Sequence, residues 1–142
     1  MKIIFLDIDG VLVNRKSIMA SKRIPHKFDK DCVQLLNKII TVTGASVVVS
    51  SVWRRLYDCR QLLSDRGVKN CVGCIPNARL PTRGQEIQSW LDNHERVTNF
   101  VILDDDADMG SLSDRLVQTK FELGLTKADA EKAIKILTKE GS

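Results

Sequence analysis

The chain has 142 residues, 43% of them hydrophobic and 28% charged, which is enough for one hydrophobic core and too little for two. Its apolar runs are much shorter than the roughly 18 to 20 residues of a membrane span, and Asp7 interrupts the first run too early for a signal peptide. We therefore expect a soluble, cytoplasmic protein that forms one domain over residues 1–142 and does not contact a membrane. The net charge of +4 favours partners that carry phosphate, because a positive surface attracts anions.

Apolar segments with strand and helix patterns alternate along the chain. Short runs rich in β-branched residues predict buried strands at 2–6, 45–49, 100–103 and 116–119. Apolar residues at helical spacing predict helices at 32–40, at 56–63, after Thr82 and after Thr126, with Asp29 and Gly44 as the ends of the first. This alternation predicts an α/β fold: a three-layer, Rossmann-like domain with a mainly parallel central sheet.

Residues 71–81 contain two prolines and Gly73, and they predict a loop. Cys71 and Cys74 within it have the spacing of metal ligands. A structural zinc would need two further ligands, and the other cysteines and the histidines stand alone in the sequence. We interpret the pair as thiols on either side of a turn glycine, with zinc as the alternative.

Oxygen-bearing side chains follow three of the predicted strands where each strand ends. These residues are Asp7 and Asp9, Ser50 and Ser51, and Asp104 and Asp105. Because the carboxyl ends of parallel strands meet at one edge of a sheet, we expect these side chains to lie close together. Carboxylates gathered in this way repel one another, and a hard dication such as Mg²⁺ relieves the repulsion while binding a substrate phosphate. The sequence therefore predicts a magnesium site at this edge.

Asp7-Ile8-Asp9-Gly10-Val11-Leu12 resembles the signature of the haloacid-dehalogenase-like (HAD) superfamily. Its later motifs follow in order, with a strand that ends at Ser50 and an acidic strand end at Asp104 and Asp105. The resemblance implies a Mg²⁺-dependent phosphatase, a hydrolase that acts on phosphomonoesters. In such an enzyme Asp7 would attack phosphorus and form an aspartyl-phosphate, while Asp9 would protonate the leaving oxygen and then activate the hydrolytic water.

The resemblance also implies the binding groups of the site. Ser50 would bind the transferring phosphoryl group, while Asp7, Asp9 through its backbone carbonyl, Asp104 and Asp105 would hold Mg²⁺. Asp108 is the alternative to Asp105, because the family uses either adjacent aspartates or a pair four residues apart at this motif. Asp106 is expected to have no role.

The lysine usual in the third family motif is missing from the stretch before the strand at 100–103. Arg83 at the start of the preceding helix is the best substitute, with Lys69 as the second choice. The segment Ser50-Ser51-Val52-Trp53-Arg54-Arg55 is further similar to a HAD subgroup associated with RNA-repair proteins. That similarity makes Arg54 a candidate cation for substrate phosphate and makes Trp53 either a contact surface for substrate or a core residue.

Many HAD phosphatases carry a cap domain over the site, and this chain has little room for one. Only residues 14–27, which are basic, exceed what the predicted helix and strand between Asp9 and Ser50 need; they would form either a flap for a polyanion or a solvated loop. An open site suits a phosphate on a nucleic-acid end or a protein, and nucleotides are also candidate substrates. The alternatives to a phosphatase are a catalytically weak module that binds phosphorylated ends or a protein partner, and a phosphotransferase. The oligomeric state stays open.

Overall fold

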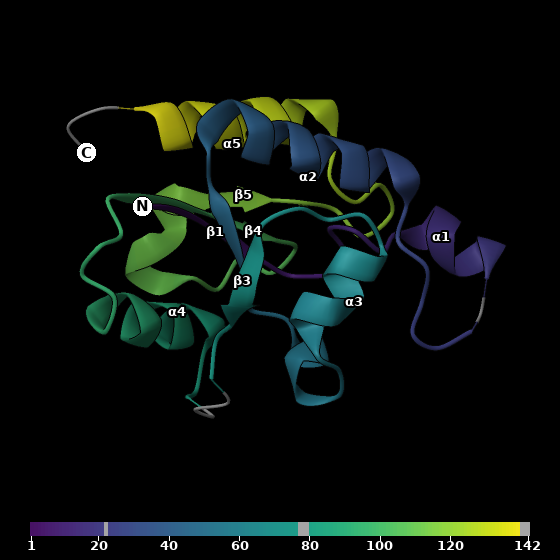
Figure 1. Cartoon of the computed structure of the whole chain (residues 1–142), viewed down its shortest axis with the longest axis horizontal. Coiled ribbons are helices and arrows are strands. Elements are labelled where there is room, and N and C mark those ends of the chain that lie inside the picture. Colours follow the sequence, from purple (N-terminus) through teal and green to yellow (C-terminus); the bar gives the residue numbers. More distant parts are fainter. Residues whose placement is uncertain (22, 77–79, 140–142) are drawn as a thin grey trace.

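The computed structural model describes residues 1–21, 23–76 and 80–139. A five-stranded parallel sheet forms its centre, with the strand order β3-β2-β1-β4-β5 (Figure 1). The strands are β1 (Lys2–Leu6), β2 (Ser46–Val49), β3 (Cys71–Cys74), β4 (Asn99–Asp104) and β5 (Leu116–Gln118). β1 lies in the middle of the sheet, so the residues that follow it emerge between the ends of β2 and β4.

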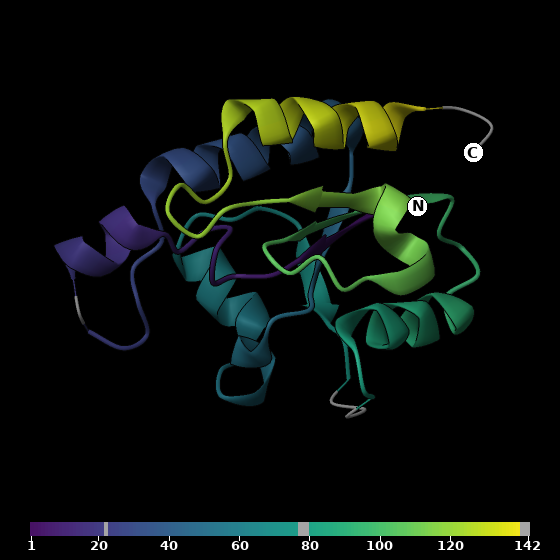
Figure 2. The ribbon, with the colours of Figure 1, turned by 180° about the vertical axis from the view of Figure 1, so that it is seen from behind.

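Helices cover both faces of this sheet. They are α1 (Arg15–Ala20), α2 (Lys30–Thr43), α3 (Cys59–Asp65), α4 (Arg83–Asp92) and α5 (Lys127–Thr138), with two 3₁₀ helices, η1 (Val52–Arg55) and η2 (Gly110–Arg115). Figures 1 and 2 show α2 and α5 side by side on one face and α4 on the other. The predicted α/β fold with a parallel sheet between two helical layers is confirmed.

The strands bury side chains on both faces, which explains their continuous apolar sequences. In β1, Ile4 and Leu6 join the core beneath α2 and α5, whereas Ile3 and Phe5 join a second core beneath α4 and η2. All four are fully buried. A strand held on both faces and both edges is the most rigid part of such a sheet, and β1 is the strand that leads into the first acidic motif.

The predicted loop at 71–81 is wrong in its first part, because Cys71–Cys74 forms the edge strand β3. This strand pairs in parallel with β2, and Gly73 lies opposite Val48 rather than in a turn. Four residues with a glycine have little strand character of their own, so pairing with β2 decides their conformation. Residues 77–79 of the predicted loop lie outside the described residues. Within residues 1–21, 23–76 and 80–139, the cysteines belong to no group with the geometry of a metal site.

One helix is present that was not predicted, and another begins later than predicted. Residues 14–27 contain the unpredicted helix α1, whose six residues begin at a capping box between Asn14 and Ser17. The helix predicted at 56–63 begins later, at Cys59, because the side chain of Asp58 accepts a hydrogen bond from the Gln61 N–H and caps it. The chain before it winds into η1.

The remaining helix ends follow the sequence signals. Asp29 caps α2, and Gly44 ends it in the left-handed conformation with a φ of 73°. Thr82 and Thr126 form capping boxes at the starts of α4 and α5. None of the described helices has the length and apolar character needed to cross a membrane.

Candidate active site

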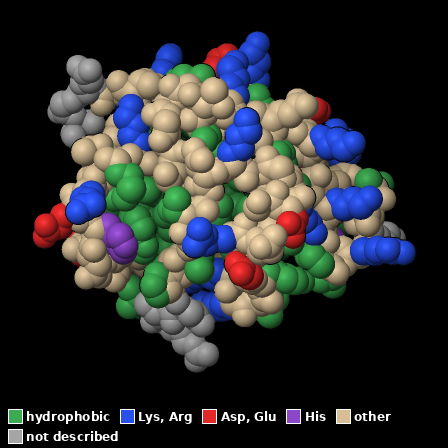
Figure 3. All heavy atoms as spheres, in the orientation of Figure 1, with side chains coloured by type: hydrophobic (Ala, Val, Ile, Leu, Met, Phe, Trp, Pro, Cys, Tyr) green, Lys and Arg blue, Asp and Glu red, His purple; other side chains and the backbone are tan. Residues whose placement is uncertain are grey.

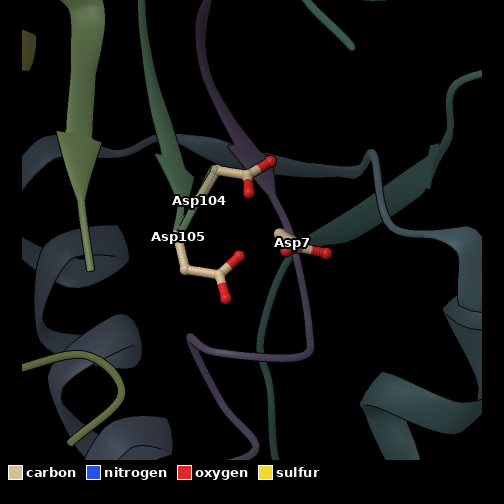
Figure 4. A group of neighbouring side chains, drawn as sticks. All are labelled: Asp7, Asp104 and Asp105. Atoms are coloured by element: carbon tan, nitrogen blue, oxygen red, sulfur yellow. The ribbon is translucent and has the colours of Figure 1, made fainter. Parts of the chain in front are cut away.

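Parallel pairing of β1 with β4 brings the two acidic motifs together. Leu6 lies opposite Leu103, so the next residues, Asp7 and Asp104, emerge side by side, and the Asp7 N–H donates to the Leu103 carbonyl at 3.0 Å. Figure 4 shows their side chains with that of Asp105 at the ends of the two strands. Each of the three offers a carboxylate oxygen within 4.8 Å of the others. The predicted convergence of the two acidic strand ends is therefore present in the fold.

This proximity leaves the acidic group electrostatically strained. Burial and the neighbouring Asp104 carboxylate raise the pKa of Asp7 to about 8. Burial also raises the pKa of Asp104. Buried like charges disfavour ionisation of one another, and a bound cation would restore it. A bound cation would therefore stabilise the ionised acidic group.

The close approach of Asp105 depends on Gly10. Gly10 has a φ of 87°, and a Cβ atom there would lie 2.4 Å from the Asp105 Oδ2. Only glycine gives both the left-handed backbone and the space for this carboxylate. The Thr119 hydroxyl donates to the Gly10 carbonyl at 2.6 Å and fixes the turn from the end of β5. Thr119 is a supporting residue that sequence patterns did not indicate.

Asp105, rather than Asp108, joins Asp7 and Asp104. Asp108 is exposed, and its N–H donates to the Asp106 Oδ1 at 2.9 Å. The Asp106 N–H donates in turn to the Asp104 Oδ1 at 3.0 Å. Asp106 and Asp108 therefore shape the loop after β4, and of the two patterns open at this motif, the adjacent aspartates are the ones that the fold brings together.

Ser50 lies at the same edge, at the end of β2, with a buried side chain. Its N–H donates to the Leu6 carbonyl at 2.9 Å, which sets it beside the end of β1. In the described part of the chain its hydroxyl is buried and has no hydrogen-bond partner. Ser51 differs, because its hydroxyl caps η1 by accepting from the Trp53 N–H at 3.2 Å. A buried hydroxyl without a partner is costly unless a ligand uses it.

Arg83 is the cation that the fold brings to the acidic group. It is the first residue of α4, and its Nη1 lies 2.9 Å from the Asp104 Oδ2 and 3.4 Å from the Asp7 Oδ1. Burial opposes its charge, but Asp7 and Asp104 outweigh this effect and raise its pKa. Lys69 precedes β3 and is exposed at the amino ends of the strands, the opposite edge of the sheet. The structure therefore brings Arg83, and not Lys69, to the acidic strand ends.

Arg54 is placed differently from the substrate cation that the sequence predicts. Its side chain is only 2% exposed and forms an ion pair with Glu86 on α4 at 2.5 Å. It also donates to the backbone carbonyls of Ser50 and Ser51, at 2.8 and 3.0 Å. This geometry indicates a structural role, in which Arg54 ties the Ser50 segment to α4. Glu86, the partner that decides this, lies 32 residues away and has no recognisable sequence signal.

Asp9 does not belong to the three-carboxylate group. Its Oδ2 accepts a hydrogen bond from the Trp53 indole N–H at 3.0 Å. Trp53 is 7% exposed, so it is a core residue, and this polar contact adds a second role that neither sequence interpretation included. The carboxyl group of Asp9 thus lies outside the acidic group, and contact of its backbone carbonyl with a metal stays a prediction of the family resemblance.

The donor set and its surroundings fit a hard dication with a phosphate ligand. The three carboxylates supply oxygen ligands, and the unpaired Ser50 hydroxyl and the Arg83 guanidinium supply donors for phosphate oxygens. A phosphoryl group bridging the two sides would satisfy both the excess negative charge and the unused hydroxyl. The site is thus chemically suited to phosphoryl transfer.

Comparison with known protein families agrees with the resemblance found in the sequence. The family model described as the HAD domain in Swiss Army Knife RNA repair proteins matches residues 3–130. Comparisons with curated proteins and with solved structures find no match. The matched region begins within β1 and contains the other four strands and each of the site residues described above. The chain therefore belongs to the family of HAD domains found in Swiss Army Knife RNA repair proteins.

Proposed function

We propose that this domain is a Mg²⁺-dependent phosphatase that hydrolyses phosphomonoesters through an aspartyl-phosphate on Asp7. The observation that carries this proposal is the gathering of Asp7, Asp104 and Asp105 beside the unpaired hydroxyl of Ser50. The proposed nucleophile, metal ligands and phosphate donor thus share one edge of the sheet. HAD domains generally use Mg²⁺, which agrees with this donor set.

The side chains of Asp7, Asp104 and Asp105 would hold the metal, together with the Asp9 carbonyl. When bound, Mg²⁺ would neutralise charge on both the carboxylates and the phosphate, which lowers the repulsion between nucleophile and substrate. In the proposed reaction the Asp7 carboxylate attacks phosphorus while Asp9 gives a proton to the leaving oxygen. Asp9 then takes a proton from water, which attacks phosphorus and releases Asp7.

Ser50 and Arg83 would stabilise the charge that spreads over the phosphoryl oxygens in the transition state. The Ser50 hydroxyl is buried and uses no donor capacity on protein, so it needs no rearrangement to bind an oxygen. Arg83 starts α4, where the positive end of the helix adds to its own charge. A guanidinium that pairs with carboxylates before substrate arrives can exchange them for phosphate oxygens.

The proposed substrates are phosphorylated nucleic-acid ends, with nucleotides as smaller members of the same class. Membership in an RNA-repair family supports this class. An open site agrees with the order of elements between Asp9 and Arg83, where α1, α2, β2, η1, α3 and β3 are joined by short connections. On the face shown in Figure 3, Lys and Arg side chains are scattered rather than gathered. We propose that recognition depends mainly on the terminal phosphate and its nearest groups.

A second candidate function rests on the ion pairs of Arg83 with Asp7 and Asp104. An arginine at this place, where the family usually has a lysine, could hold the nucleophile too tightly for turnover. The domain would then bind phosphorylated ends without hydrolysing them. Binding of a phosphorylated oligonucleotide with no hydrolysis under Mg²⁺ or Mn²⁺ would favour this function.

The test of the phosphatase is Asp7→Asn, assayed with an aryl phosphate in the presence of Mg²⁺ and of a chelator. We expect turnover to fall by at least about 1,000-fold, because the amide is not a nucleophile. Asp106→Asn is the matched control, since Asp106 is an exposed aspartate on the same edge. Turnover that survives in Asp7→Asn, or that a chelator leaves unchanged, would contradict the proposal. Parallel assays with 5′- and 3′-phosphorylated oligonucleotides and a mononucleotide then rank the substrates.

A further inference from the structure

The hydrogen bond from Trp53 to Asp9 joins a buried aromatic residue to the proposed acid of the reaction. The indole Nε1 donates to the Asp9 Oδ2 at 3.0 Å. In the described part of the chain, the other carboxylate oxygen, Oδ1, accepts no hydrogen bond from protein. The two oxygens of Asp9 are therefore inequivalent before substrate binds.

Packed side chains around the Trp53 ring set the direction of the indole. The Phe28 ring lies 6.0 Å and the Tyr57 ring 5.5 Å from the Trp53 ring, centroid to centroid. The Arg66 guanidinium lies 4.6 Å from the Phe28 ring and donates to the carbonyls of Pro25 and His26. Trp53 is thus held from the segment before α2, from the turn between η1 and α3, and from the residue that follows α3. Such packing leaves the indole N–H few other directions.

We propose that Trp53 is a positioning residue that fixes which oxygen of Asp9 carries the catalytic proton. This inference rests on the proposed phosphatase function and assigns a task within it. The oxygen that accepts from the indole N–H is the less favourable one to carry a proton, because a hydroxyl oxygen is a weaker acceptor than a carbonyl oxygen. In the proposed reaction the proton that Asp9 transfers is therefore carried by Oδ1, and the fixed indole sets the orientation of that O–H group.

Both proton transfers then use the same oxygen. In the first step the Asp7 carboxylate forms a bond to phosphorus, the bond to the leaving oxygen breaks with its electron pair, and that oxygen takes the proton from the Asp9 Oδ1. In the second step a water attacks phosphorus and gives a proton back to the Asp9 Oδ1, while the bond to Asp7 breaks and restores its carboxylate. The Trp53 N–H stays on Oδ2 throughout.

Trp53→Phe removes the N–H and keeps an aromatic ring in the core. We expect kcat/KM for an alkyl phosphate to fall by about 10- to 100-fold, the usual worth of a well-placed acid. The value for p-nitrophenyl phosphate should change by less than about 3-fold, because its leaving oxygen needs little protonation. A purely structural defect would instead lower kcat/KM equally for both substrates. The dependence of kcat/KM on the leaving group is therefore the diagnostic measurement.

Two further variants separate the hydrogen bond from the packing. Replacing Trp53 by β-(benzothienyl)alanine, which has sulfur in place of the N–H and nearly the same shape, should reproduce the leaving-group dependence of Trp53→Phe. Trp90→Phe is the matched control, because Trp90 packs on Phe5 and His94 in the other core. This variant should lower kcat/KM equally for both substrates or leave both values unchanged.

Asp9→Asn distinguishes failure of this inference from failure of the proposed function. If Asp9→Asn selectively loses hydrolysis of the alkyl phosphate and the two Trp53 variants do not, the positioning role of Trp53 is wrong while the role of Asp9 as the acid is retained. If Asp9→Asn hydrolyses both substrates like the unchanged protein, or if the unchanged protein hydrolyses neither, the proposed mechanism fails and the role of Trp53 with it. The same selective loss in Asp9→Asn and in both Trp53 variants would support the inference.

Discussion

The acidic edge formed by β1 and β4 contrasts with the neighbouring segment formed by η1 and α4. On the acidic edge, three buried or half-buried carboxylates lie together. In the described part of the chain Arg83 pairs with Asp7 and Asp104, and burial raises the pKa of both. In the neighbouring segment, Arg54 and Glu86 neutralise each other almost completely out of solvent. Both regions hold charge in the interior, but only the second is internally compensated.

This difference indicates that a bound cation would stabilise the acidic edge and would not stabilise the Arg54–Glu86 pair. Removing a charge from an uncompensated group relieves repulsion, whereas removing one from a compensated pair leaves its partner buried and unpaired. Substitutions in the two regions should therefore change stability in opposite directions. Activity should depend directly on the acidic edge and only indirectly on the Arg54–Glu86 pair.

The largest stability effect is expected from Glu86→Gln. It leaves the Arg54 guanidinium buried without a countercharge, which typically costs about 3 to 5 kcal/mol. Urea denaturation of the metal-free protein measures this loss, with the exposed Glu122→Gln as control. Equal unfolding free energies for the two variants would show that the pair is not the compensated region we describe.

Asp104→Asn should lower kcat/KM by at least about 100-fold, because the charge stabilisation from a metal ion is worth several kcal/mol. The same variant should stabilise the metal-free protein, since it removes a carboxylate from the crowded group. Asp106→Asn should change neither property. Phosphatase assays combined with thermal unfolding in a chelator give both readouts, and a destabilised Asp104→Asn would break the contrast between the two regions.

Ser50→Ala and Ser51→Ala should have smaller effects, one on activity and the other on stability. Ser50→Ala should lower kcat/KM by about 10- to 100-fold through loss of one donor to the phosphoryl group, without loss of stability. Ser51→Ala removes the cap of η1 and should cost about 1 kcal/mol of unfolding free energy. Steady-state kinetics and urea denaturation of both variants test this separation. A Ser50→Ala protein that is less stable and fully active would reverse the two assignments.

The last prediction concerns the pH dependence of stability in the metal-free protein. The pKa of Asp7 rises from 3.8 to about 8 on folding, mainly through burial and then through Asp104. The unfolded chain thus loses this proton near pH 4 and the folded chain near pH 8, so the Asp7 contribution to stability falls as pH rises between these values and is constant above them. Thermal unfolding in a chelator from pH 5 to pH 8 should show this fall as a shift of several degrees. Asp7→Asn should flatten it, and added Mg²⁺ should oppose it.

The sequence alone determined the fold class, four of the five strands and most helix ends. Continuous β-branched runs and capping residues are local signals, and Asp29, Gly44, Thr82 and Thr126 act in the structure as their chemistry predicts. The convergence of Asp7 with Asp104 was also predictable, because parallel strands end at one edge of a sheet. These features depend on neighbours in the chain or on one general rule of topology.

Only the tertiary structure decided the partners of the remaining groups. β3 forms because β2 offers it an edge, and Arg54 is buried because Glu86 reaches it from another helix. Asp105, and not Asp108, joins the acidic group because the turn at Gly10 leaves space for its carboxylate. Trp53 donates to Asp9 because packing from three separate segments directs its indole. Each of these outcomes depends on contacts between residues far apart in the chain, and residue type alone does not specify which of several chemically suitable partners will come within reach.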